Sequence, residues 1–83
     1  MQTIIVEVFV PAVAESFDFR LPSTAYLKNV VDEAIRILEA TQHNIMFDRE
    51  QPMLCDRTYN RAMNLWETVA EAGLRDGARL ILV

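Results

Sequence analysis

The hydrophobic pattern changes its period once between residues 3 and 40, and this change constrains the fold more than any other feature. Up to residue 21 apolar side chains recur at every second position, as they do in strands. From residue 25 to 40 they recur every three to four positions, as on one face of a helix. A chain of 83 residues with this order forms one domain, 1–83, in which the helix lies across a sheet.

The first two strands are predicted from their alternation. Thr3–Val10 (TIIVEVFV) forms the first, and Pro11 ends it because proline has no amide hydrogen for a sheet ladder. Phe17–Leu21 (FDFRL) forms the second. The short connection between them predicts an antiparallel hairpin.

The helix is predicted over Ala25–Ala40, with Ser23 or Thr24 as its N-cap. Asp32 and Arg36, four residues apart, are expected to form an ion pair on its polar side. A membrane-surface helix is the alternative, but the polar side lacks the basic character which that role requires. The apolar stripe consists of Leu27, Val30, Val31, Ala34, Ile35 and Leu38.

The middle of the chain is less regular. Thr41–Gln51 contains an apolar triplet, Ile45–Phe47, which fits a short strand or a loop tucked under the helix. Pro52–Cys55 and Arg61–Met63 are predicted as short third and fourth strands, joined by a turn over Asp56–Asn60.

Near the end, Asn64 and Glu67 have the spacing of a capping box, which predicts a short helix over Leu65–Ala72. Gly73 follows as a left-handed C-terminal cap. The dipeptide Asp76-Gly77 predicts a turn before a last strand, Ala78–Val83, whose uniformly apolar sequence suits a central position.

These elements predict an α+β fold, the ubiquitin-like β-grasp: ββαββ with a short extra helix before the last strand. The last strand is expected to lie parallel to the first. A ferredoxin-like split fold is the alternative, but it needs a second full-length helix. The side chains expected to face the helix are Ile4, Val6, Val8, Phe17, Phe19, Leu21, Leu80 and Leu82.

The opposite sheet face then carries the candidate protein-interaction residues Ile5, Phe9, Ile81 and Val83, with Ile5 and Ile81 as predicted neighbours. Apolar groups on a solvent-facing sheet mark either a partner or dimer surface or tolerated exposure. Trp66 is a fifth candidate, either packed over the core edge or exposed as an anchor. The charged residues expected around them are Glu7, Asp18, Arg20 and Arg79.

Composition excludes several classes of partner. The net charge of −4 argues against nucleic acid, which requires a basic surface. No apolar run reaches the roughly 20 residues that cross a bilayer, and Glu7 interrupts the only segment resembling a signal peptide. One cysteine, Cys55, forms no internal disulfide, so a cytoplasmic location is expected.

Catalytic chemistry finds little support. His43 is the only histidine, and nothing in the spacing brings it to Cys55 as a nucleophile–base pair. Metal-ligand spacing and phosphate-binding glycine motifs are both missing from the sequence. We therefore expect no enzyme activity, no catalytic residue, no cofactor and no metal site.

Two motifs carry a family resemblance: D-x-R-L-P before the helix, and a glycine–apolar–x-D-G-x-R-L pattern near the end. They are formed by Asp18, Arg20, Leu21 and Pro22, and by Ala72, Gly73, Leu74, Asp76, Gly77, Arg79 and Leu80. With these motifs the chain resembles the YukD-like ubiquitin-like proteins of Gram-positive type VII (WXG100) secretion systems. The resemblance implies a cytoplasmic accessory protein that binds components of the secretion machinery.

Ubiquitin-style conjugation is not expected, because it uses a C-terminal Gly-Gly tail and this sequence ends Leu82-Val83. Three alternatives stay open. The chain is the N-terminal cytoplasmic domain of a larger membrane secretion component, a truncated sulfur carrier or modifier, or an unrelated homodimeric scaffold.

Overall fold

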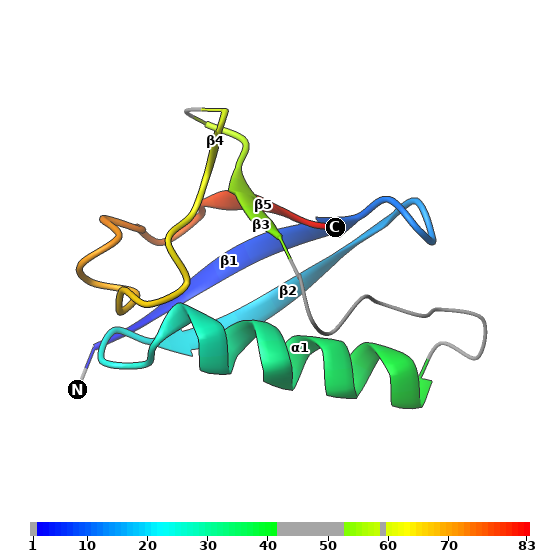
Figure 1. The fold of residues 1–83 in the computed structure, drawn as a ribbon, viewed down its shortest axis with the longest axis horizontal. Coiled ribbons are helices and arrows are strands. Elements are labelled where there is room, and N and C mark those ends of the chain that lie inside the picture. Colours follow the sequence, from blue (N-terminus) through cyan, green and yellow to red (C-terminus); the bar gives the residue numbers. More distant parts are fainter. Residues whose placement is uncertain (1, 42–52, 59) are drawn as a thin grey trace.

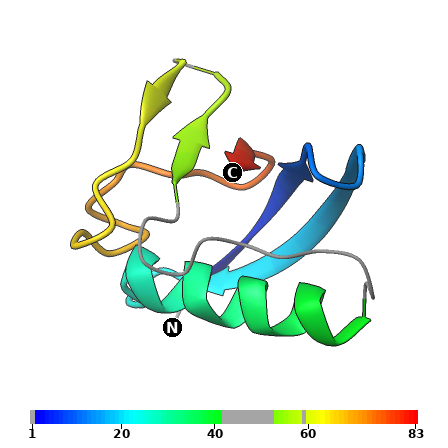
Figure 2. The ribbon, with the colours of Figure 1, turned by 45° about the vertical axis from the view of Figure 1, so that its right-hand side comes forward.

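The structure is a computed structural model that describes residues 2–41, 53–58 and 60–83. These residues form a five-stranded sheet in the order β2-β1-β5-β3-β4, with one helix across one of its faces (Figure 1 and Figure 2). The elements are β1 (Thr3–Val10), β2 (Glu15–Pro22), α1 (Leu27–Thr41), β3 (Leu54–Asp56), β4 (Arg61–Ala62) and β5 (Arg79–Leu82).

The predicted topology is confirmed. β1 and β2 form an antiparallel hairpin, and β5 lies in the middle of the sheet, parallel to β1 and antiparallel to β3. This is the ubiquitin-like β-grasp arrangement. β2 begins two residues earlier than predicted because the turn closes within four residues: Val13 N–H donates to the Val10 carbonyl at 3.2 Å, and Ala14 takes a left-handed conformation (φ 55°).

The core lies between the sheet and α1, and the predicted alternation of faces is confirmed. The fully buried side chains with the largest volume are Leu27, Ile35, Leu38, Leu80 and Leu82. Burying each such side chain contributes about 1.5–3 kcal/mol. The helical stripe is buried as predicted, except that Val30 is half-buried.

The start of α1 differs from the prediction. The helix begins at Leu27, and its first amides donate to backbone carbonyls of a distant segment: Leu27 N–H to Glu67 (2.9 Å) and Lys28 N–H to Leu65 (2.8 Å). Ser23 and Thr24 therefore lie in the turn before the helix and are not its cap. Tertiary hydrogen bonds have replaced the side-chain cap that the sequence suggested.

The predicted Asp32–Arg36 ion pair is wrong. Asp32 pairs with Lys28 at 3.3 Å, and Arg36 pairs with Glu33, one turn earlier on the helix. Asp32 has a basic residue four positions away on either side, Lys28 and Arg36, and Arg36 also has Glu33 within reach, so the i, i+4 rule did not select one pairing.

The predicted short helix over Leu65–Ala72 is not formed, and consecutive turns occupy this segment. The predicted capping box of Asn64 and Glu67 is not formed either; the reciprocal bonds lie four residues later, where Thr68 and Glu71 exchange side-chain hydrogen bonds with each other's amides at 2.9 and 3.1 Å. Asn64 instead forms a local turn by accepting the Trp66 amide at 3.0 Å. Because the Leu65 and Glu67 carbonyls bond to α1, they are not available for a helix of their own.

The remaining predictions differ only at element ends. β3, β4 and β5 each overlap the predicted strand to within two residues at either end. Gly77 takes a positive φ angle (86°), as the predicted turn requires, and Gly73 takes one too (74°), although the helix that it was predicted to cap is not formed. His43 and the Ile45–Phe47 triplet lie outside the described residues.

Candidate protein-interaction surface

The sheet face opposite α1 carries a row of apolar side chains across three strands. The register places Phe9 of β1 beside Ile81 of β5, and Ile81 beside Cys55 of β3. One step further along, Val83 and Met53 exchange both backbone hydrogen bonds, at 2.9 and 3.2 Å. We name Phe9, Met53, Cys55, Ile81 and Val83 the sheet-face patch.

The core explains why these side chains point away from the helix. Each alternates along its strand with a side chain that is at most 5% exposed, such as Val8, Leu54 and Leu80. The patch is accessible: Met53 is 52% and Val83 62% exposed, whereas Phe9, Cys55 and Ile81 are half-buried. Central residues in such a patch are partly covered by their own neighbours and edge residues are open.

The register also corrects the predicted contact between Ile5 and Ile81. Ile5 lies at the other end of β1, where its carbonyl accepts the Gly77 amide (2.8 Å) and its amide donates to Asp76 Oδ1 (2.7 Å). Glu7 separates it from Phe9 on the same face. Ile5 is 45% exposed but stands outside the sheet-face patch.

The border of the patch is basic although the chain is acidic. The Arg57 guanidinium lies 5.6 Å from the centre of the Phe9 ring, within the range of a cation–π contact. Arg79 is the cross-strand neighbour of Arg57, whose amide donates to the Arg79 carbonyl, and the Arg79 side chain pairs with Glu7 at 3.9 Å. The patch therefore presents an apolar centre beside two guanidinium groups, a composition typical of protein interfaces.

Trp66 lies elsewhere. Its side chain is 73% exposed, which excludes packing over the core edge. The backbone on either side of it bonds to the first residues of α1, so Trp66 stands beside the start of the helix and not on the opposite sheet face. The structure brings Phe9, Ile81 and Val83 together but leaves Ile5 and Trp66 apart from them.

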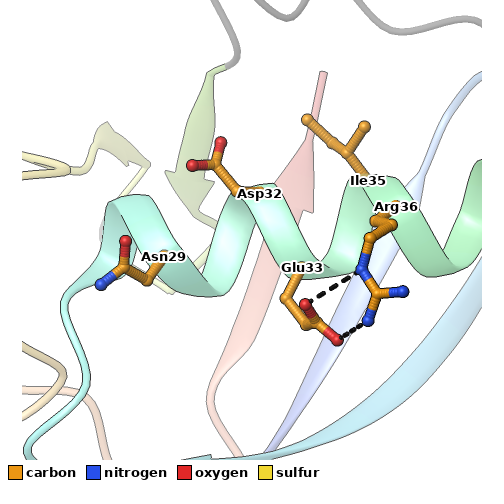
Figure 3. Close-up of a pocket in the computed structure, with 5 residues that line it drawn as sticks. All are labelled: Asn29, Asp32, Glu33, Ile35 and Arg36. Carbon is orange, nitrogen blue, oxygen red and sulfur yellow. Dashed lines mark hydrogen bonds and ion pairs between the residues drawn. The ribbon is translucent and has the colours of Figure 1, made fainter.

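The helix surface has a hollow of about 530 Å³, but it shows no catalytic arrangement (Figure 3). Figure 3 shows Glu33 and Arg36 joined by two contacts while Asp32 points away from them. The hydrogen bond from Arg36, helped by its positive charge, lowers the pKa of the Glu33 carboxyl, and the same contact raises the pKa of Arg36. Both side chains are more than half exposed, so the pair is a surface ion pair.

Other polar groups also have structural roles. Asp56 is 5% exposed, and its carboxylate accepts the Thr58 amide at 2.8 Å, which closes the turn after β3. In the part of the chain that the structure describes, no three His, Cys, Asp or Glu side chains gather into a group that could hold a metal ion. Over the same residues, α1 lacks the length and apolar character of a membrane-spanning helix.

A sequence model described as "WXG100 protein secretion system (Wss), protein YukD" matches residues 3–82. The chain belongs to the YukD family. No curated protein sequence matches it significantly.

Solved structures share the fold of this YukD family member. The ubiquitin-like domain of the Mycobacterium tuberculosis type VII secretion system protein EccD1 is 20% identical, with a TM-score of 0.75 over 100% of this chain and 99% of that one. The EccD5 ubiquitin-like domain from Mycobacterium xenopi is 16% identical, with a TM-score of 0.80 over 100% and 94%. Caldiarchaeum subterraneum ubiquitin is 13% identical, with a TM-score of 0.76 over 98% and 91%.

Sequence reasoning missed the contribution of β3. Met53 and Cys55 belong to the sheet-face patch and Arg57 lies at its border, yet none of them was a candidate interaction residue. Their alternation with the buried Leu54 and Asp56 was the available signal, but it becomes informative only once β3 is known to pair with β5.

Proposed function

We propose that this YukD family member is a non-enzymatic protein-interaction module of a WXG100 (type VII) secretion system, working in the cytoplasm. The observation that carries the proposal is the sheet-face patch, a continuous apolar surface that the core does not use. Its centre of Phe9 and Ile81 is available to a partner, and Arg57 and Arg79 at the border can contact that partner's carboxylates. The net charge of −4 disfavours nucleic acid as the partner.

The module is proposed to act without conjugation. Both glycines of the sequence, Gly73 and Gly77, take positive φ angles in turns before β5, so neither serves as a reactive terminal glycine. The intact mass of the native protein, measured from its own cells, tests this point. A covalent adduct through the carboxyl terminus would contradict it.

A second candidate function is that of a ubiquitin-like domain within a larger membrane secretion component. It is favoured by the likeness to the EccD1 domain, which spans nearly the whole of both chains. Both candidates use the same interaction surface. The reading frame of the gene in its source genome separates them, because the second requires a continuation into membrane-spanning segments.

Affinity capture from the native lysate tests the proposed surface. The tagged wild-type protein is expected to enrich WXG100 proteins or other components of the secretion system, and Ile81→Glu is expected to lose them. Tyr26→Glu is the matched control, because Tyr26 is 51% exposed beside the start of α1, away from the patch. Equal capture of partners by the wild type, Ile81→Glu and Tyr26→Glu would contradict the role of the sheet-face patch. Loss of the partners with Trp66→Ala alone would place the binding surface around Trp66 instead.

A further inference from the structure

β2 presents an edge that pairs with no other strand among the described residues, since it is the first strand of the sheet and bonds only to β1. The Ser23 amide donates to the Gln2 carbonyl, whereas the Glu7 amide donates to Ala78, on the β5 side. Hydrogen-bonded and non-bonded pairs alternate in an antiparallel ladder. The amides and carbonyls of Ser16, Asp18 and Arg20 therefore point outward from the edge.

The charges along this edge are unbalanced within the chain. The register places Asp18 directly opposite Glu7, a pairing of like charges that destabilises a sheet. Glu7 has Arg79 on its other side at 3.9 Å, but neither Asp18 nor Arg20 forms an ion pair within the described part of the chain. Both side chains are exposed on the face opposite α1.

We propose that β2 pairs antiparallel with β2 of a second copy of this chain, across a two-fold axis at Phe19. This register places Asp18 of each copy opposite Arg20 of the other, so that both outward backbone groups of each residue are bonded and both charges are matched. The two neighbouring registers place either Asp18 opposite Asp18 or Arg20 opposite Arg20. The sequence Asp18-Phe19-Arg20 is thus complementary to itself in one register.

The helix side of the edge supplies apolar contact in the same register. A groove of about 290 Å³ runs between β2 and α1, and most of its lining is apolar. Phe19 is half-buried there and would meet Phe19 of the second copy at the non-hydrogen-bonded position, where opposing side chains lie closest. The pairing is short, because the Pro22 carbonyl already accepts the Ala25 amide, so a weak, concentration-dependent dimer is expected. The groove's main apolar residues are Phe19, Leu21, Ala25, Val30, Ala34 and Ile37.

Charge reversal at the edge tests this dimer by sedimentation velocity, from dilute protein up to the millimolar range. Asp18→Arg and Arg20→Asp each create like-charge pairs across the axis and are expected to weaken dimerisation about tenfold. The double variant Asp18→Arg/Arg20→Asp restores opposite pairs and is expected to dimerise like wild type. The two single variants, mixed together, are expected to form a heterodimer, since each supplies the charges that the other lacks.

The controls separate this surface from the sheet-face patch. Arg75→Asp reverses an exposed charge outside β2 and should leave the dimer unchanged, as should Ile81→Glu. Far-UV circular dichroism verifies that each variant is folded. Asp18→Arg is expected to remain folded, because it removes the repulsion between Asp18 and Glu7. A wild-type chain that stays monomeric over the whole concentration range overturns the proposal. It does so even if an unrelated extended peptide is found to bind the β2 edge. A dimer that ignores the reversals, or that only Ile81→Glu disrupts, overturns it too.

Discussion

The neighbouring residues Leu80 and Ile81 should respond very differently to the same substitution. Leu80 is 1% exposed between sheet and helix, whereas Ile81 is half-buried on the opposite face. Threonine is β-branched, so it preserves strand propensity at both positions and leaves burial as the main difference. Leu80→Thr and Ile81→Thr are therefore a matched pair.

The expected magnitudes follow from burial. Leu80→Thr leaves a cavity and buries a hydroxyl, which should lower the free energy of unfolding by about 3–4 kcal/mol. Ile81→Thr removes partly exposed apolar surface and should cost about 1 kcal/mol or less. An 83-residue domain has a total stability of about 4–12 kcal/mol, so the first change consumes a large fraction of it.

Guanidinium denaturation measures both values. Far-UV circular dichroism is the appropriate signal, because the 73% exposed Trp66 changes its environment little on unfolding. If Ile81→Thr costs as much as Leu80→Thr, then Ile81 is part of the core, and the sheet-face patch is not a surface left free for a partner.

Three further predictions concern electrostatics and turns. Arg36 lowers the pKa of Glu33 in the folded protein, so this carboxylate stabilises the fold above its ordinary titration range, and the stabilisation is lost as the pH falls through the folded pKa. Carboxyl NMR titration of Arg36→Gln should show a higher pKa for Glu33 than in the wild type, and an unchanged pKa would contradict the ion pair. Gly77→Ala should lower the free energy of unfolding by about 1 kcal/mol through its positive φ (86°), since nothing lies within 4 Å to obstruct a Cβ; an unchanged thermal midpoint would argue against strain at this turn. Asp76→Ala removes the 2.7 Å bond from the Ile5 amide and should cost about 1 kcal/mol, measured by the same denaturation, with Asp76→Asn as the variant that retains an acceptor.

Local patterns predicted the features of this fold that depend on local physics. The alternation in Thr3–Val10 identified the buried face of β1, and the helical period of the Leu27–Leu38 stripe identified the buried face of α1. Alternation fixes the face of each side chain but not the alignment of two strands. The sequence therefore placed Ile81 on the correct face and paired it with Ile5 instead of Phe9.

The segment between β4 and β5 was mispredicted because distant contacts decide its conformation. Asn64 and Glu67 have capping-box spacing, but the carbonyls of Leu65 and Glu67 are taken by the first amides of α1. No short-range signal indicates that competition. The same limit hid Met53 and Cys55, since their place in the sheet-face patch depends on the pairing of β3 with β5.

The proposed function depends on the binding of a secretion-system protein to the sheet-face patch. Amide chemical-shift mapping tests it most directly: the ¹⁵N-labelled chain is titrated with the component that affinity capture identifies. We expect the largest shifts to cluster at Phe9, Cys55, Ile81 and Val83, and we expect Ile81→Glu to abolish them. Shifts confined to the surface around Tyr26 and Trp66, with the sheet-face patch unaffected, would contradict it.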